Sequence, residues 1–245
     1  AIRRRTGRTY VQLYEGFKDS IRRRYAKQMK QVARRGLREG TRITWHGREV
    51  HYPKFVPARA RTKKTGYEII YYKDDGDARP GQYRIHLPLA GASKGATSEF
   101  VARATERSPV SFTKEGGMLF ASVVPHRRIY QRTDLFGLPP GKRAPNGGES
   151  YRKQLTFGLR ATAPTIAADG TVAFTVNDRG GTTLRIGELR GGRIAKRRVL
   201  VPNKGRFDQA FTPSFSPDGK RIAYSVWTAG GFRDIRVVDA ETGAI

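Results

Sequence analysis

The fold is decided by residues 211–243, which read FTPSFSPDGKRIAYSVWTAGGFRDIRVVDAETG. An extended entry is followed by a turn at Ser216–Gly219, with the proline, aspartate and glycine that such turns favour. Polar and apolar residues then alternate over Arg221–Val226. A glycine-rich loop leads from there to a third extended segment over Ile235–Val238. Alternation with a period of two residues between turn signals at this spacing predicts an antiparallel meander.

This stretch resembles the repeat of TolB-type β-propellers, which are also described as WD40-like or PD40 repeats. The resemblance rests on SFSPDGKRIAYS at residues 214–225 and DIRVVDAETG at residues 234–243. It implies that each repeat forms one four-stranded antiparallel sheet, called a blade. A blade cannot bury both of its faces alone, so its stability comes from packing against neighbouring blades.

Three weaker copies of the pattern precede this stretch. Each copy is marked by an anchoring proline, and the four anchors are Pro53, Pro109, Pro164 and Pro213. They recur at intervals of roughly 50 residues, a period that indicates a propeller or another repeat array. We therefore predict an all-β fold over residues 41–245, a partial β-propeller of about four blades. The last copy has only three strands, so we expect the propeller to be truncated at the C-terminus.

Two further features of the repeat can be checked against a structure. A short segment containing threonine stands before three of the anchors, and the resemblance implies that it is the outer strand of the preceding blade: Ile43-Thr44, Ala104-Thr105 and Leu155-Thr156. Aromatic residues also recur at one equivalent position, where we expect the core between blades: Tyr71, Phe120, Phe174 and Tyr224.

Residues 1–40 form a basic N-terminal segment, which can be the end of a preceding domain. Apolar residues recur about every 3.6 positions over Tyr14–Leu37, which predicts one amphipathic α-helix that Gly36 or Gly40 ends. Because one face of this helix is cationic, binding to a membrane surface or to RNA stays an alternative interpretation. The narrow apolar stripe favours a helix that packs on a neighbouring domain.

The chain is strongly basic, with 48 Lys and Arg against 21 Asp and Glu and a formal net charge of +27. Such a charge raises nucleic acid or an anionic surface as a partner. The basic residues are spread over the whole sequence, however, and this diffuse distribution favours a basic surface over a dedicated binding patch. The absence of cysteine excludes disulfides and thiolate chemistry, and no apolar run is long enough for a transmembrane helix.

No motif in the sequence carries recognisable catalytic chemistry. The G-x-S-x-G pattern at Gly91–Gly95 lacks the strand and helix that a nucleophile elbow needs. The four histidines show no metal-ligand spacing, and Asp169 and Asp218 belong to turns. The acidic run Asp74–Asp77 fits a turn better than a calcium loop. We expect no catalytic residue, no metal site and no cofactor.

The resemblance implies a bacterial envelope or secreted protein whose propeller binds another protein or covers a linked peptidase domain. We therefore predict a non-catalytic propeller scaffold for protein–protein interaction in the periplasm or outside the cell. The candidate partner surface lies in two loops at the face where propellers bind partners, and it comprises Arg206, Phe207, Asp208, Trp227, Phe232 and Arg233.

Two alternatives stay open. The chain can be the accessory propeller of a peptidase whose catalytic domain lies outside residues 1–245, or it can be a basic nucleic-acid-binding protein. Flanking sequence with a hydrolase or metallopeptidase motif would establish the first alternative. Binding of DNA or RNA that depends on salt would establish the second.

Overall fold

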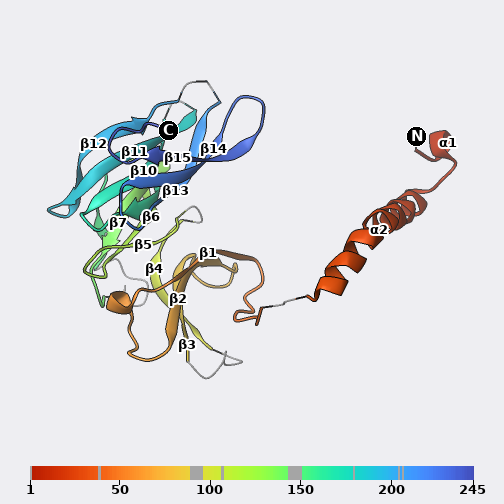
Figure 1. Cartoon of the computed structure of the whole chain (residues 1–245), viewed down its shortest axis with the longest axis horizontal. Helices are drawn as coiled ribbons and strands as arrows, with labels where there is room; N and C mark the ends of the chain where they lie inside the picture. Colours follow the sequence, from red (N-terminus) through yellow and green to blue (C-terminus); the bar gives the residue numbers. More distant parts are fainter. Residues whose placement is uncertain are drawn as a thin grey trace. The chain divides into compact units, whose positions relative to one another are not determined.

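The structure is a computed structural model in which residues 2–37, 40–88, 96–105, 108–142, 151–178, 180–203, 205 and 207–245 are described. The chain divides into two compact units, Ala1–Arg42 and Ile43–Ile245, and each is described here by itself. The first unit is helical and the second consists of β-sheets (Figure 1).

The first unit contains a short helix α1 (Ile2–Thr6) and a long helix α2 (Tyr10–Arg35). Helix α2 begins one turn before the predicted Tyr14, because Thr9 forms a capping box with Gln12. The Thr9 hydroxyl accepts from the Gln12 N–H, and the Gln12 side chain accepts from the Thr9 N–H at 2.8 Å. The helix ends at Gly36, whose φ of 79° suits glycine.

Among the described helices, none combines the length and the apolar character that crossing a membrane requires.

The second unit is a series of four blades, as predicted. The strands of the first two blades are β1 (Glu49–Phe55), β2 (Tyr67–Asp74), β3 (Gly81–Leu87) and β4 (Ser98–Arg103), then β5 (Ser111–Phe112), β6 (Met118–His126), β7 (Tyr130–Leu138) and β8 (Lys153–Gln154). A 3-10 turn, η1 (Ala58–Ala60), follows β1. The last two blades comprise β9 (Ala161–Ile166), β10 (Thr171–Asp178), β11 (Gly181–Arg190) and β12 (Arg193–Val201), then β13 (Gln209–Phe215), β14 (Arg221–Trp227) and β15 (Arg233–Asp239).

Within each blade the strands pair antiparallel in chain order, which is the expected meander. The first three blades have four strands and the fourth has three among the described residues. A single parallel bridge, Thr182 with Gln209, links the sheets of the third and fourth blades. The all-β propeller architecture is thus confirmed.

The predicted strand at Ile43-Thr44 is wrong. This segment lies over one face of the first blade, where Ile43 packs against Tyr71 and Tyr83. Nearby, His46 Nε2 lies 2.8 Å from the Tyr71 hydroxyl oxygen. Because the segment covers a face of the sheet, it forms no ladder of backbone hydrogen bonds. The other two segments, Ala104-Thr105 and Leu155-Thr156, directly follow the outer strands β4 and β8, which end at Arg103 and Gln154.

Three of the anchoring prolines mark a bulge in the innermost strand of their blade. The residue before each proline has a positive φ, with values of 53°, 48° and 42° for Tyr52, Ala163 and Thr212. The pairing register shifts at the same places. Such a backbone costs about 1–3 kcal/mol in a non-glycine residue and persists only where the surroundings fix it. The anchors therefore mark a strained kink that β1, β9 and β13 share.

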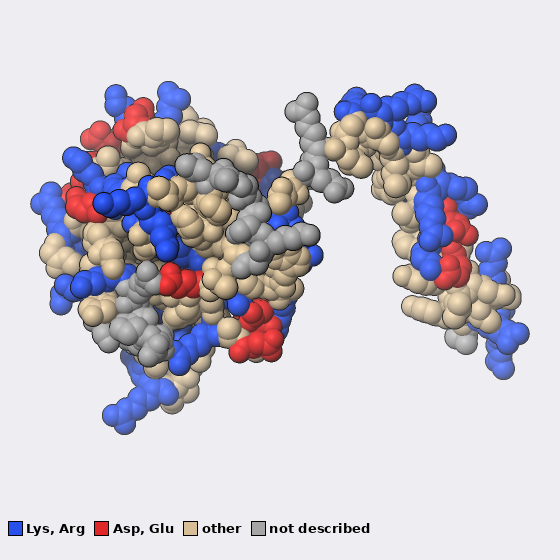
Figure 2. All heavy atoms as spheres, turned by 90° about the horizontal axis from the view of Figure 1, so that it is seen from below, with Lys and Arg blue, Asp and Glu red and all other residues tan. Residues whose placement is uncertain are grey.

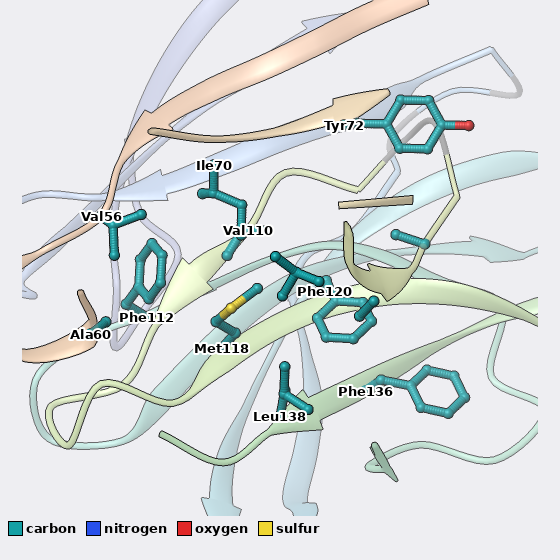
Figure 3. Packing of buried hydrophobic residues seen from close by; sticks show 13 residues of the cluster. Val56, Ala60, Ile70, Tyr72, Val110, Phe112, Met118, Phe120, Phe136 and Leu138 are labelled. Atoms are coloured by element: carbon teal, nitrogen blue, oxygen red, sulfur yellow. The ribbon is translucent and has the colours of Figure 1, made fainter. Parts of the chain in front are cut away.

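Apolar residues fill the space between successive blades. Figure 3 shows one such cluster between the first and second blades, which includes Ile70 and Tyr72 from β2 together with Phe120 and Phe136 from β6 and β7. Comparable clusters join the second blade to the third and the third to the fourth. This layered core is what the repeat predicts, because each blade buries its faces against its neighbours.

The recurrent aromatic position lies in these interfaces, as expected. Phe120, Phe174 and Tyr224 are each at most 2% exposed and pack against the preceding blade. Tyr71 is the equivalent residue of the first blade, and it packs against the segment that carries Ile43. The opposite face of the fourth blade has no such cover among the described residues, and Ile235 there is 79% exposed.

Candidate binding site at the strand-entry end of the propeller

A concave pocket of about 1000 Å³ opens at the end of the second unit where the innermost strands begin. We call this end the strand-entry end. All four blades contribute to its walls, which include Tyr52 from the first, Tyr130 from the second, Thr162 from the third and Phe211 from the fourth. The three strained residues that precede the anchoring prolines all line the pocket. Their unusual backbone thus shapes the wall of the site.

Four arginines line the pocket, namely Arg127, Arg132, Arg160 and Arg233. The described lining residues include no aspartate, glutamate or lysine. None of the four guanidinium groups forms an ion pair with a carboxylate of the described part of the chain. We call this site the arginine pocket, because its uncompensated positive charge is its main chemical feature.

Arg127 lies at the tip of the β6–β7 hairpin, in a turn whose positive φ values arginine rarely adopts. The Ile129 N–H donates to the His126 carbonyl at 3.3 Å, and the two central residues have φ values of 50° (Arg127) and 63° (Arg128). A turn with two positive φ values usually contains asparagine and glycine. Two arginines occupy this turn although its backbone conformation is strained for them, and one of the two, Arg127, lines the pocket.

Arg160 and Arg233 approach the pocket from the third and fourth blades. The carbonyl of Arg160, whose φ is 58°, accepts from the Asn177 N–H at 3.2 Å, which ties this residue to the end of β10. The Arg233 guanidinium lies 5.2 Å from the ring centroid of Trp227 and 5.4 Å from that of Phe211. These cation–π contacts position Arg233 without neutralising its charge.

The electrostatic effect of the arginines extends to His126. Burial lowers the pKa of His126, and the positive charges of Arg132, Arg127 and Arg160 lower it further. Asp134 acts in the opposite direction but does not reverse the shift. A histidine whose protonated form is disfavoured by three guanidinium groups indicates a positive potential beside the pocket.

The rest of the wall consists mainly of hydroxyl and amide side chains. The Thr162 and Thr175 hydroxyls lie 2.9 Å apart on neighbouring strands of the third blade. The other hydroxyl and amide residues of the wall are Thr105, Gln131, Thr133, Asn177, Thr182, Gln209, Thr212 and Ser225. The pocket therefore offers cations, neutral hydrogen-bonding groups and aromatic faces, which suits recognition of a polar, anionic ligand.

The structure brings only part of the predicted partner surface into this pocket. Trp227 and Arg233 line it. Phe207 and Phe232 do not, and both are largely exposed. Asp208 lies in a separate cavity of about 330 Å³, where its carboxylate accepts from the Gly205 N–H at 2.9 Å.

Of the other residues named from the sequence, Arg206 and the Gly91–Gly95 motif lie outside the described residues. Asp169 and Asp218, which were assigned to turns, lie in turns, and Asp74 is the last residue of β2. The Asp218 carboxylate accepts from Ser216 and from the Lys220 N–H. Asp169 accepts from Thr171, and Asp74 accepts from the Gly76 N–H.

Sequence reasoning missed Arg127, Arg132 and Arg160 as site residues. Arg127 and its neighbour were visible only as one basic pair among many. Figure 2 shows the reason, since Lys and Arg side chains are scattered over the visible face of the second unit. Their convergence on one pocket depends on how the blades pack.

A second cavity of about 410 Å³ lies toward the other ends of the innermost strands. Lys54 lines it, and its Nζ donates to the Val110 carbonyl at 3.2 Å. Burial lowers the pKa of Lys54. Arg59 and Lys114 line it as well, and Arg59 Nε donates to the Thr113 carbonyl at 3.0 Å. Because two of its three cations already bond to backbone carbonyls, the second cavity offers less unpaired charge than the arginine pocket.

Comparison with known proteins supports the fold. No family model matches the sequence, and no curated protein matches it. Among solved structures, TolB of Acinetobacter baumannii is similar at 19% identity, with a TM-score of 0.54 over 80% of this chain and 42% of that TolB. A puromycin-hydrolyzing peptidase of Mycobacterium tuberculosis is similar at 14% identity, with a TM-score of 0.50 over 81% of this chain and 28% of the peptidase.

The chain therefore spans less than half the length of either protein. At these identities the likeness concerns the fold alone. The fold is that of a TolB-like β-propeller segment, in agreement with the repeat read from the sequence.

Proposed function

We propose that this TolB-like propeller segment is a non-catalytic scaffold that binds a segment of another protein at the arginine pocket. The observation that supports this proposal best is that side chains from all four blades converge on one concave site. Rigid repeat scaffolds commonly recognise partners through such shared surfaces. A site assembled from four repeats also requires the assembled fold, which links binding to propeller integrity.

The chemistry of the wall suits a polypeptide. Hydroxyl and amide side chains such as Thr162, Asn177 and Gln209 can exchange hydrogen bonds with peptide groups. Trp227 and Tyr130 offer partly exposed aromatic faces, which are frequent at the centres of protein interfaces. The volume of about 1000 Å³ accommodates a few residues of a partner rather than a folded domain.

We place this activity in the bacterial cell envelope. The support is the resemblance of residues 211–243 to the repeat of TolB-type proteins. Fractionation of cells that express the full-length protein with an epitope tag tests this compartment. Recovery with periplasmic markers is expected, and recovery with cytoplasmic markers would contradict the proposal.

A selection from a displayed library of random peptides tests the binding function. A blocking variant, Gln131→Trp, fills the mouth of the pocket from an exposed position on the β6–β7 hairpin. The matched control, Val199→Trp, adds the same ring to a partly exposed residue of the outer strand β12, outside the pocket. Peptides selected on the unmodified chain are expected to bind the control and to lose binding to Gln131→Trp.

Two results would overturn the proposal. If the selected peptides bind both tryptophan variants equally, the peptide-binding site lies outside this pocket. If no peptide is selected at all, the proposed binding function is wrong. Mass spectrometry of the incubated peptides adds a separate check, because cleavage would show an enzyme in place of a scaffold.

A further inference from the structure

We infer that the arginine pocket recognises an acidic peptide segment, whose carboxylates pair with Arg127, Arg132, Arg160 and Arg233. This inference rests on the proposed function and specifies the chemistry of the partner. Guanidinium groups form two parallel hydrogen bonds to a carboxylate, and such charge-assisted bonds are stronger than neutral ones. Four arginines without carboxylate partners in the described chain leave this capacity unused.

The placement of the arginines favours a ligand that crosses the pocket. Arg127 and Arg132 come from the second blade, Arg160 precedes the first strand of the third, and Arg233 begins the last strand of the fourth. A single small anion could contact only part of such a set. A chain with several carboxylates could engage cations on different walls.

The hydrogen-bonding side chains of the wall support a peptide over other anionic ligands. Hydroxyl and amide groups from three blades line the pocket, among them Thr133, Asn177 and Gln209. Such groups both donate and accept hydrogen bonds, so they can pair with the N–H and C=O groups of an extended peptide. The phosphates of nucleic acid only accept hydrogen bonds and would leave the acceptor atoms of this wall without a partner.

The charge distribution also argues against nucleic acid as the ligand. A nucleic-acid backbone presents phosphates at regular intervals and is commonly bound by a continuous basic track. On the face that Figure 2 shows, the Lys and Arg side chains of the second unit are instead scattered. The concentrated and uncompensated charge lies inside a pocket formed by the blades.

Fluorescence anisotropy with defined probes tests the inference. The first probe is a labelled peptide of repeating Asp-Glu-Tyr-Gly, and the second carries Asn and Gln in place of Asp and Glu. The third probe is a labelled oligothymidylate of the same length. The acidic peptide is expected to bind at low ionic strength, to weaken as salt is added, and to bind at least tenfold more tightly than the amide peptide.

Single substitutions locate the binding. We expect each single substitution in the pocket to lower the affinity for the acidic peptide by about fivefold, which is the scale of one exposed ion pair. The four variants are Arg127→Gln, Arg132→Gln, Arg160→Gln and Arg233→Gln. Arg197→Gln is the matched control, because Arg197 is an exposed arginine of the outer strand β12 and does not line the pocket. It removes the same charge and is expected to change the affinity by less than about twofold. Thermal unfolding of each variant confirms that it is folded.

The outcomes separate this inference from the proposed function. If peptides selected from the library bind at the pocket but the acidic and amide probes bind equally, the inference fails and the proposed function stands. If the oligothymidylate binds more tightly than the acidic peptide, and the pocket substitutions weaken it, the ligand is nucleic acid and both fail. If Arg197→Gln and the pocket variants lose equal affinity for the acidic peptide, binding depends on net charge alone and the inference is overturned.

Discussion

At the scale of single residues, Arg128 is an example of backbone strain close to the candidate site. Its φ of 63° lies in the left-handed region, which costs about 1–2 kcal/mol for a residue other than glycine. Arg128 does not line the pocket, although its neighbour Arg127 does. The conformation of the turn and the charge of the pocket can therefore be separated by mutation.

Arg128→Gly is expected to raise the free energy of unfolding by about 1 kcal/mol, because glycine adopts a positive φ without strain. Urea denaturation measures this change. Arg236→Gly serves as the control in the regular pairing of β14 with β15, where glycine is expected to be destabilising. A decrease in stability for Arg128→Gly would contradict the conformation described for this turn.

His126 reports on the electrostatic potential beside the pocket. Burial and the charges of Arg132, Arg127 and Arg160 hold its pKa below the ordinary range, so removal of one charge should raise that pKa. We expect a higher pKa for His126 in Arg160→Gln than in the unmodified chain, as measured by NMR titration of the imidazole signals. An unchanged pKa in this variant would contradict the electrostatic effect of Arg160 on His126.

The residues of the site were only partly predictable from the sequence. Trp227 and Arg233 were identifiable because the loop between two clear strands carried large side chains. Arg127, Arg132 and Arg160 were not, because a basic residue is common in this chain and local sequence does not reveal which ones converge. The positive φ of the residue before three of the four anchoring prolines also contradicts the local preference for extended backbone at such positions.

At the scale of elements, the loop after β1 shows how one carboxylate organises a basic insertion. Glu68 is 1% exposed and accepts from the Thr62 N–H, the Thr62 hydroxyl and the Lys63 N–H, at 2.7–3.1 Å. Arg84 Nη1 lies 3.2 Å from its other oxygen. Burial alone would raise the pKa of Glu68, but these hydrogen bonds and the Arg84 charge lower it overall.

A lowered pKa in the folded state stabilises the fold above the pKa of the unfolded chain, which is about 4.3 for glutamate. This contribution is lost as pH falls through the folded-state pKa. At pH 7, Glu68→Gln is expected to cost about 3 kcal/mol, because it removes the negative charge that faces the largely buried Arg84. The difference in unfolding free energy between the two proteins should shrink in acid, and a constant difference would contradict this account.

The faces of the blades differ in the stability that they contribute. Phe174 is fully buried against the second blade, whereas Ile235 lies on the uncovered face of the fourth blade. Phe174→Ala is expected to cost about 3–5 kcal/mol, and Ile235→Ala less than about 0.5 kcal/mol. Denaturant titration compares them, and similar costs would show that another element covers the fourth blade.

The elements themselves were largely predictable, because turn residues and two-residue alternation are local signals. The alternating segment Arg221–Val226 lies within β14, and the recurrent aromatics Tyr71, Phe120 and Phe174 lie at equivalent places within β2, β6 and β10. The segment at Ile43-Thr44 was assigned wrongly because its apolar residue covers a sheet face, and sequence alternation does not distinguish a face from an edge. The start of α2 was missed by one turn, because the capping box at Thr9 precedes the apolar stripe.

At the scale of the whole molecule, the arginine pocket exists only because four blades meet. Residues roughly 50 positions apart in the repeat, such as Ala163 and Thr212, become neighbours on one wall. This explains why the period of the sequence predicted the propeller and could not predict the site. It also explains how a chain with diffuse charge of +27 can carry one localised cationic pocket.

Hydrogen exchange measured with and without the acidic Asp-Glu-Tyr-Gly peptide tests the central claim most directly, because it locates the bound segment on the backbone. We predict slower exchange in residues 127–133, 160–163 and 209–212, which border the arginine pocket, and no change in the outer strand β12. Protection confined to β12 or to the α2 segment, or no protection at a saturating peptide concentration, would contradict the assignment of this pocket as the binding site.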